Sequence, residues 1–258
     1  MKTYQTAQIA KIIGVHPNTI RFYEEMQLLP VIPRTASGYR IFNDRHLAQL
    51  RLIRTAFRAE IISSRLRREV YQIVKLAAAG NVHEAYQGTK RYLEHLREEK
   101  EGAEEAIRLT LHIIEKHGNT EENIVLHGRV EVAKKLGITI DVLRDWERNG
   151  LLQVPRDKNG HRKYGQREMN RLKIIRTLRN AHYSMMSILR MLNRLDQGDR
   201  DIRKVIDTPE EEEDIVCAAD RYITALSMAE GDALEMMDML EIMIESSQST
   251  EKLEDREL

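Results

Sequence analysis

The 258-residue chain is long enough for one large domain or two to three small ones, and a hydrophobic content of 41% is enough to build cores. Charged residues make up 32% of the chain and aromatic residues 5%, which favours small, helix-rich units. No apolar run approaches about 18 residues and the polar N-terminus lacks the apolar segment of a signal peptide, so we expect a cytoplasmic protein without a membrane span. The single cysteine, Cys217, excludes an intramolecular disulfide and a multi-cysteine metal site.

The formal charge of zero conceals an alternation of basic and acidic blocks. Residues 1–76 hold 13 lysines and arginines against 5 acids, and residues 126–208 hold 19 against 10. Residues 77–125 hold 6 against 10, and residues 209–258 hold 3 against 16. Basic blocks that contain aromatic residues suit a polyanion such as DNA, because contacts to phosphates release counterions. Ordinary solvated helix surface is the alternative interpretation of the same charges.

One pattern occurs twice along the chain. The string "IRFYEEMQLL" from Ile20 aligns with "LRDWERNGLL" from Leu143, at an offset of 123 residues. Further on the offset is 122, so that "LIRT" at 52–55 meets "IIRT" at 174–177. Loops tolerate the loss of one residue, so the pattern indicates a duplicated module.

The first elements of each copy predict a helix-turn-helix. "TAQIAKIIG" and "RVEVAKKLG" predict short helices that end at Gly14 and Gly137, which suit left-handed caps. The second helices are expected to begin at Pro17, a tolerated first-turn residue, and after Thr139, a good N-cap. A helix, a glycine-containing turn and a second helix are typical of the helix-turn-helix motif.

The next elements are a hairpin and two helices in each copy. "PRTASGYRIF" and "PRDKNGHRKY" predict short hairpins, because a turn glycine lies between Pro-Arg and alternating basic and aromatic residues. Helices are expected at about 44–59 and 63–79 in the first copy, and at about 165–181 and 184–197 in the second.

A long helix is expected after each copy, at about 82–117 and about 209–247. Thr208-Pro209-Glu210-Glu211 predicts the start of the second, where the acidic run Glu210–Asp214 suits the helix dipole and a solvated face. The second carries a heptad stripe of Ile215, Ala219, Tyr222, Leu226, Ala229, Ala233, Met236, Leu240 and Met243. The first carries a weaker stripe of Leu93, Leu96, Ala103, Ile107 and Ile114, interrupted by Lys100 and Thr110.

Taken in this order, the elements resemble those of the MerR family of bacterial transcription regulators. The residues that carry the resemblance are "NTIRFYEEMQLL" with "SGYRIF" and "DVLRDWERNGLL" with "GHRKY". The resemblance implies a winged helix-turn-helix whose second helix enters the DNA major groove and whose hairpin wing lies on the flanking backbone. It also implies dimers formed by an antiparallel coiled coil, a bent and untwisted promoter, and RNA polymerase as a partner at that promoter.

Three features depart from the family pattern. Most members carry one such module per chain, whereas this chain carries two. Gln27 stands where Gly150 stands in the second copy, and a left-handed conformation there would cost about 1 kcal/mol. His161 replaces the tyrosine of the wing in the second copy.

The predicted fold class is mainly α, with two winged helix-turn-helix modules, each with a small β-hairpin wing, and two long coiled-coil helices. The predicted division is a first DNA-binding domain at 1–80, a linking coiled-coil helix at 81–119, a second DNA-binding domain at 120–205, a C-terminal coiled-coil helix at 206–247 and a frayed tail at 248–258.

The side chains expected to contact double-stranded DNA lie on the second helix and the hairpin of each copy. Arg and Asn at a helix N-terminus can reach base edges, and Tyr, Thr, Arg and Lys can hold phosphates. They are His16, Asn18, Thr19, Arg21, Tyr23, Arg34, Tyr39 and Arg40 in the first copy, and Thr139, Asp141, Arg144, Trp146, Arg156, Lys158, His161, Arg162 and Lys163 in the second. Asp141 can accept from cytosine, so the copies are expected to differ in sequence preference. The alternative is that the aromatic residues only pack the helices and that the two helix arginines pair with nearby carboxylates.

No other chemistry has candidate residues in the sequence. The nine histidines are scattered, so no metal site is expected, and no cofactor or catalytic constellation is recognised, so an enzyme is not expected. The methionines Met228, Met236, Met237, Met239 and Met243 offer a soft binding surface, but their helical spacing favours a core.

The function predicted from these features is sequence-specific DNA-binding transcription regulation at a palindromic or pseudo-palindromic promoter operator, in a nucleoid-associated protein. The duplication supplies two reading heads, as a pseudo-dimeric monomer with paired long helices or as a homodimer with four heads. Two alternatives are an architectural or segregation protein that bridges DNA, and a helical adaptor that uses one head for a protein partner.

Overall fold

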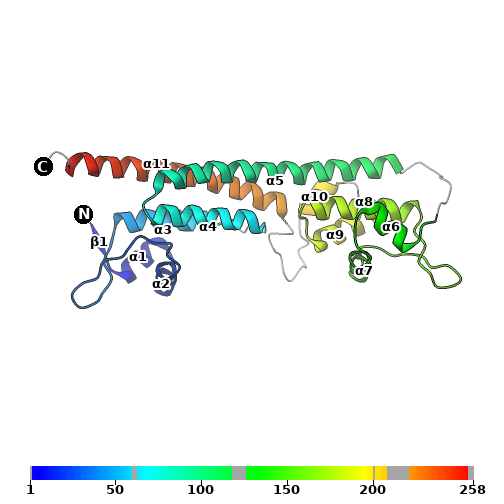
Figure 1. Cartoon of the computed structure of the whole chain (residues 1–258), viewed down its shortest axis with the longest axis horizontal. Coiled ribbons are helices and arrows are strands. Elements are labelled where there is room, and N and C mark those ends of the chain that lie inside the picture. Colours follow the sequence, from blue (N-terminus) through cyan, green and yellow to red (C-terminus); the bar gives the residue numbers. More distant parts are fainter. Residues whose placement is uncertain (1, 60–62, 118–125, 200, 208–220, 255–258) are drawn as a thin grey trace. The chain divides into compact units, whose positions relative to one another are not determined.

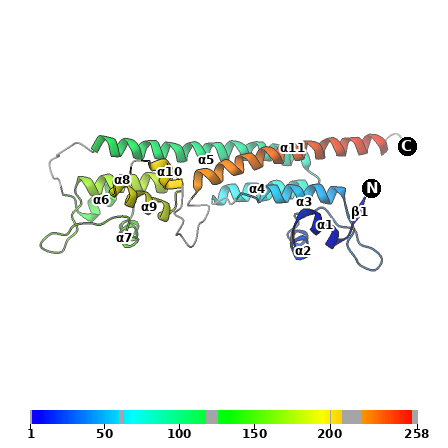
Figure 2. The ribbon, with the colours of Figure 1, turned by 180° about the vertical axis from the view of Figure 1, so that it is seen from behind.

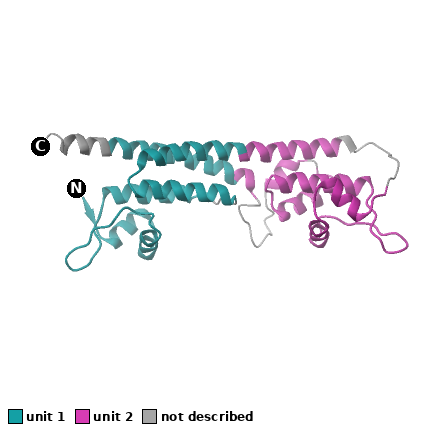
Figure 3. Ribbon diagram, in the orientation of Figure 1, with its two compact units in different colours: residues 1–98, 225–258 teal, residues 99–224 magenta. Residues whose placement is uncertain are grey.

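The computed structural model describes residues 2–59, 63–117, 126–199, 201–207 and 221–254, which form mainly helices (Figure 1). Two compact units divide the chain. Unit 1 comprises residues 1–98 and 225–258, and unit 2 comprises residues 99–224 (Figure 3). Each unit contains one copy of the repeated pattern. None of the described helices is long and apolar enough to cross a membrane. The serial domain boundaries given above remain a prediction.

Unit 1 opens with the elements that the sequence predicts for the first copy. The helices are α1 (Thr6–Ile13), α2 (Pro17–Glu25), α3 (Asp44–Ala56) and α4 (Ser64–Ala78). Helix α1 ends because Gly14 adopts a left-handed φ of 74°. Ile9, Ile20 and Leu50 are buried between these helices, so the apolar faces of the three helices form one core. The mainly helical class is confirmed.

A two-stranded sheet and the wing complete this module. Strand β1 (Thr3–Tyr4), which the sequence did not predict, pairs antiparallel with β2 (Phe42–Asn43). In the wing, the Thr35 amide donates to the Tyr39 carbonyl at 2.8 Å and Gly38 supplies the turn with a φ of 84°. The wing is therefore a short hairpin between α2 and β2, as predicted.

The two long helices pack antiparallel within unit 1, which contains the first part of α5 (Val82–His117) and nearly all of α11 (Tyr222–Glu254). Figures 1 and 2 show these parts side by side over α3 and α4. The Tyr86 hydroxyl donates to Glu241 at 2.7 Å, and Arg97 Nε donates to Glu230 at 2.8 Å. The partner number falls as the α5 number rises, so the helices run in opposite directions.

The predicted stripe of α11 is confirmed at Leu226, Ala229, Ala233, Met236 and Leu240, which are all buried. Its first members, Ile215 and Ala219, lie outside the described residues, as do the predicted helix start at 208–211 and Cys217. The predicted end at residue 247 is corrected, because α11 continues to Glu254.

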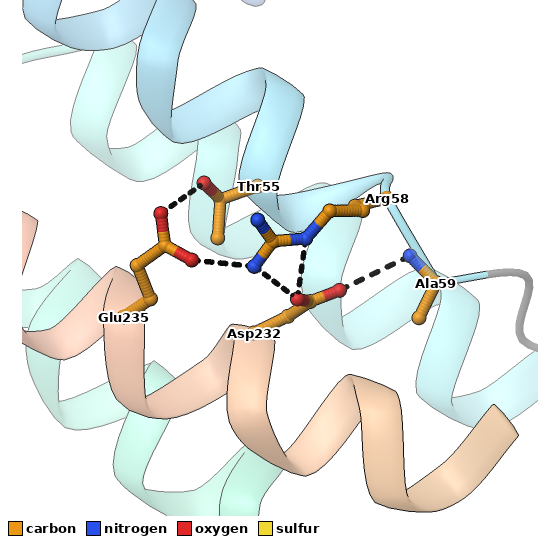
Figure 4. Close-up of polar contacts among 5 residues, drawn as sticks. All are labelled: Thr55, Arg58, Ala59, Asp232 and Glu235. Atoms are coloured by element: carbon orange, nitrogen blue, oxygen red, sulfur yellow. Dashed lines mark hydrogen bonds and ion pairs between the residues drawn. The ribbon is translucent and has the colours of Figure 1, made fainter. Parts of the chain in front are cut away.

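A polar cluster joins α11 to the end of α3 in unit 1 (Figure 4). Arg58 Nε donates to Asp232 at 2.7 Å and the Ala59 amide donates to the other oxygen of the same carboxylate at 3.1 Å. Glu235 accepts from Arg58 and, at 3.2 Å, from the Thr55 hydroxyl. Asp232 therefore satisfies the Ala59 amide just after α3 and neutralises Arg58, and both ion pairs raise the pKa of that guanidinium.

Unit 2 repeats the module with α6 (Arg129–Leu136), α7 (Ile140–Arg148), α8 (Gln166–Asn180) and α9 (Met185–Asp196). Gly137 ends α6 with a φ of 61°, and the Thr139 hydroxyl caps α7 by accepting from the Val142 amide at 3.2 Å, as predicted. A bridge between His127 and Tyr164 stands in place of the β1–β2 pair.

One helix of unit 2, α10 (Ile202–Asp207), was not predicted. Its carbonyls are held by the buried guanidinium of Arg190, which donates to Val205 at 3.0 Å and Ile206 at 3.4 Å. The second part of α5 also belongs to this unit. There Thr110 is fully buried and donates to the Ala106 carbonyl at 2.8 Å, so the expectation that Thr110 interrupts the apolar stripe is wrong.

Candidate nucleic-acid interface

The exposed N-terminus of α2 collects the first group of predicted side chains. His16 caps the helix, because its Nδ1 accepts from the Asn18 amide at 3.2 Å. Arg21 donates to the side-chain oxygen of Asn18 at 2.8 Å, one turn along the same exposed face. Thr19 is half-buried beside them. The positive end of the helix dipole and Arg21 make this face suitable for a polyanion.

Glu24, on the same helix, fixes the wing of the first module. It accepts from Arg40 Nε at 2.6 Å and from Arg34 at 3.2 Å, and both arginines were predicted to hold phosphate. Arg34 also donates to the Gly38 carbonyl at the wing turn, at 3.4 Å. One carboxylate therefore holds two cations against α2, and their remaining N–H groups can still donate to an anion.

The other two predicted residues of this module differ in exposure. Tyr39 at the wing tip is 73% exposed, so its hydroxyl can reach a ligand. Tyr23 is half-buried, with its ring 6.2 Å from that of Phe22. Tyr23 therefore contributes to packing as well as to the surface.

The second module repeats the helix contact with a different partner. Arg144 donates to the Asp141 carboxylate at 2.7 Å, where Arg21 meets the amide of Asn18. Both Arg144 and Asp141 are exposed at the start of α7. An anion that approaches Arg144 therefore meets a guanidinium already paired with a negative charge.

Glu147 occupies the position of Glu24 and organises the second wing. It pairs with Arg162 and lies 4.0 Å from Arg129, and the pair with Glu147 raises the pKa of Arg162. Arg156 donates to the Gly160 carbonyl at 3.1 Å, which repeats the contact of Arg34 with Gly38. The two wings are therefore anchored in the same way.

The turn of the second wing is held by Asp157. Its carboxylate accepts from the amides of His161 and Asn159, each at 2.9 Å, and lies 3.6 Å from Lys163. Hydrogen bonding, first from the His161 amide, lowers the pKa of Asp157. Lys158 and His161 are exposed at this turn.

Five arginines converge on one depression of about 490 Å³ in unit 2. They are Arg129, Arg144, Arg148, Arg156 and Arg162, and Glu147 is the acid among them. A concave surface with this excess of guanidinium groups is suited to phosphate. Arg129, Arg148 and the two anchoring glutamates were not among the residues predicted from the sequence. The alignment of Glu24 with Glu147 was the available signal for the anchors.

The assignment of Trp146 to DNA is corrected, because this side chain is only 5% exposed and lies in the core of the second module. Leu143 and Leu151, which precede and follow it in the sequence, are buried as well. Trp146 thus follows the alternative in which the aromatic residue packs the helix.

Both modules are winged helix-turn-helix domains by their element order, wing and exposed second helix. Residues 4–63 and 130–195 match the profile described as "MerR HTH family regulatory protein". The chain therefore belongs to the MerR family and carries two modules of that family.

Regulators of the same family share part of this sequence. A Haemophilus influenzae protein described as "Probable heavy metal-dependent transcriptional regulator" is 36% identical over 29% of this chain and 59% of its own length. The transcriptional regulator ZntR of Escherichia coli K12 is 38% identical over 20% of this chain and 38% of its own length. AdhR of Bacillus subtilis is 33% identical over 28% of this chain and 52% of its own length. The chain thus spans between 38% and 59% of the length of these relatives.

A solved structure of the family is also similar. HiNmlR, a MerR family regulator lacking the sensor domain and bound to promoter DNA, is 28% identical, with a TM-score of 0.30. The match covers 31% of this chain and 62% of that chain.

Proposed function

We propose that the protein is a transcription regulator that binds double-stranded DNA sequence-specifically, with each module placing α2 or α7 in the major groove and its wing on the flanking backbone. The carrying observation is the shared geometry of the two modules. In each, an exposed helix N-terminus with one arginine lies beside a wing whose arginine is held by a glutamate of that same helix. Guanidinium groups fixed in this way suit the spaced phosphates of a duplex.

We further propose that one chain serves as a pseudo-dimer on an imperfect palindrome. The antiparallel contacts of α5 with α11 support this, because they bury the α11 stripe inside the chain. A stripe that is already covered is not available to a second copy. The different residues beside Arg21 and Arg144 support half-sites of different sequence.

The first test combines selection, footprinting and mass. Genomic fragments that bind the purified protein are enriched and footprinted, and the mass of the complex is measured by light scattering. One chain on an imperfect inverted repeat is the expected result. Two chains on separate duplexes would favour DNA bridging, and binding without sequence preference or salt sensitivity would contradict the proposal.

Matched arginine variants test the assigned face. Arg21→Ala and Arg144→Ala are compared with Arg108→Ala, which removes an exposed arginine paired with Glu105 on α5. We expect the first two to weaken DNA binding and to reduce its salt dependence, and the third to leave both unchanged. If only one of the first two variants lost DNA affinity, the module that carries the other arginine would instead bind a different partner.

A further inference from the structure

The first module carries an apolar groove that the DNA-binding proposal does not use. The groove lies between α2 and α4, beside the end of α3, and has a volume of about 880 Å³. This volume is within the range of small-molecule sites. All of its described lining residues belong to unit 1.

Four large apolar or aromatic side chains form its walls: Phe22, Met26, Phe57 and Tyr71. The first three are 52%, 38% and 39% exposed, so this surface is open to solvent. The rings of Phe57 and Tyr71 lie 6.5 Å apart, and the Tyr71 hydroxyl donates to the Met26 carbonyl at 3.4 Å. The walls are thus braced against one another and leave apolar surface facing the groove.

The second module serves as an internal control for this surface. At the offsets of the duplication, its residues at the four wall positions are Asp145, Asn149, Arg179 and Asn193. All four are polar or charged, although the helices that carry them match those of the first module. The scaffold does not require the apolar side chains, so they point to a ligand of the first module.

The charges around the groove define the ligand further. Arg67 and Arg68 line it from α4, and none of its described lining residues is acidic. Arg58 also lines it but pairs with Asp232 and Glu235. Lys75 lies 5.1 Å from the centre of the Tyr71 ring. An apolar wall with two arginines at one side is complementary to an apolar body that carries one anionic group.

We propose that this groove binds a small apolar anion, such as an aromatic carboxylate or sulfonate. Phe22 and Tyr23 lie on the same helix as Arg21, so an occupied groove alters the surface beside the DNA-binding face. We therefore expect binding of the anion to change the affinity for DNA, and by linkage DNA would then change the affinity for the anion by the same factor. This coupling rests on the proposed function, whereas binding of the anion does not.

The test uses 8-anilinonaphthalene-1-sulfonate as the anionic probe and N-phenyl-1-naphthylamine as its uncharged counterpart, each titrated by fluorescence onto the full chain. The variant Met26→Asn/Tyr71→Asn introduces residues that the second module already tolerates. We expect this variant to lower the affinity for the anionic probe at least tenfold. The variant Arg67→Gln/Arg68→Gln should lower the affinity for the anionic probe several-fold and leave the affinity for the uncharged probe unchanged.

Two results would overturn the proposal. An unchanged affinity of the Met26→Asn/Tyr71→Asn variant for the anionic probe would place binding elsewhere, and equal losses of both probes in the arginine variant would exclude an anionic ligand. Circular dichroism of every variant verifies folding, and Arg67→Gln alone replaces the double variant if that one unfolds. Anisotropy of labelled duplex DNA with and without the probe then tests the coupling. Failure of the chain to bind DNA at all would contradict the proposed function, but would leave the probe result standing.

Discussion

At the start of the second helix, the first module pairs Arg21 with the neutral amide of Asn18, whereas the second pairs Arg144 with the carboxylate of Asp141. Both modules anchor the wing through a glutamate at the same position, Glu24 or Glu147. The contrast separates the shared scaffold from the parts that differ. Residues that fix the wing have been kept in both copies, while residues that face solvent at the helix start have changed.

The copies also differ in how charge and apolar surface are distributed. The second module gathers five arginines around one depression, whereas the first has Thr6 and Glu25 in place of Arg129 and Arg148. The first module instead exposes apolar side chains beside its second helix. The second module thus concentrates basic groups on one concave surface, and the first combines exposed arginines with an apolar groove.

The largest expected effect concerns a contact of the first module, the hydrogen bonds that Asp232 of α11 accepts from Arg58 and Ala59 just after α3. Asp232→Ala leaves the Ala59 amide and Arg58 without this acceptor, although half-exposed Arg58 can still turn to water. We expect unit 1 to lose about 2 kcal/mol of stability, less than for a fully buried pair. Hydrogen exchange of the α3 amides measures the loss. The exposed Asp238 on the same helix supplies the control variant Asp238→Ala, and equal effects of both variants would refute a stabilising role of the Asp232 contacts.

The arginine pair tests the comparison at the DNA-binding face. Arg21→Ala should cost about 1–3 kcal/mol of binding free energy on a selected operator. Arg144→Ala should cost less, because Asp141 already offsets the charge of Arg144. Titrations of both variants at two salt concentrations measure the difference, and a larger loss for Arg144→Ala would reverse the assignment.

Asn18 and Asp141 are the residues that partner these two arginines. Exchanging their types should exchange the difference in DNA affinity between the two modules. Asp141→Asn removes a negative charge beside Arg144 and should strengthen DNA binding by about 1 kcal/mol, while Asn18→Asp should weaken it by a similar amount. Binding selections with each variant would also show whether the preferred base at one half-site changes. If Asp141→Asn weakens binding, the carboxylate is accepting from a base and not merely opposing phosphate.

Much of the fold was predictable, because periodicity and turn residues act locally. The stops at Gly14 and Gly137 and the cap at Thr139 were each correct. Helix α10 was not predicted because it is short and because its carbonyls are held by Arg190, which donates to Val205, 15 residues further along the chain.

The site was predicted less completely, for a similar reason. The arginines were recognised by type, but their pairing with Glu24 and Glu147 depends on how the wing folds back on the helix. The burial of Trp146 likewise follows from packing that spacing alone does not reveal.

A smaller effect is expected where the two helix ends differ. Gln27 adopts a φ of 57°, a left-handed conformation that Gly150 adopts in the second module with a φ of 77°. Gln27→Gly should stabilise unit 1 by about 0.5 to 1 kcal/mol, because relief of strain exceeds the added freedom of the unfolded chain. Gly150→Gln should destabilise unit 2. Trp146, the single tryptophan, reports unfolding of unit 2, and hydrogen exchange reports unfolding of unit 1. A destabilised Gln27→Gly variant or a stabilised Gly150→Gln variant would contradict the strain argument.

The smallest effect should be a pH dependence confined to the first module. His46 and Glu168 occupy the same position in the first turn of α3 and α8, where each side chain accepts from a backbone amide: Asn43 at 3.1 Å and Gly165 at 2.9 Å. Burial lowers the pKa of His46 below its ordinary value of 6.5, and nearby Arg45 acts in the same direction, against the hydrogen bond to the Val31 carbonyl. The unfolded chain therefore binds more protons than the folded chain just below pH 6.5.

The contribution of His46 to the free energy of unfolding of unit 1 should thus be complete above about pH 6.5. This free energy should fall as the pH drops through the folded pKa of His46. His46→Gln keeps a capping acceptor without a titrating group, so it should remove this slope at the α3 amides, measured by hydrogen exchange between pH 5 and 7.5. Glu168→Gln is the matched control and should leave the α3 slope unchanged. A slope that persists in His46→Gln would assign the acid sensitivity to another group, and the modules would then differ here in residue type without differing in pH response.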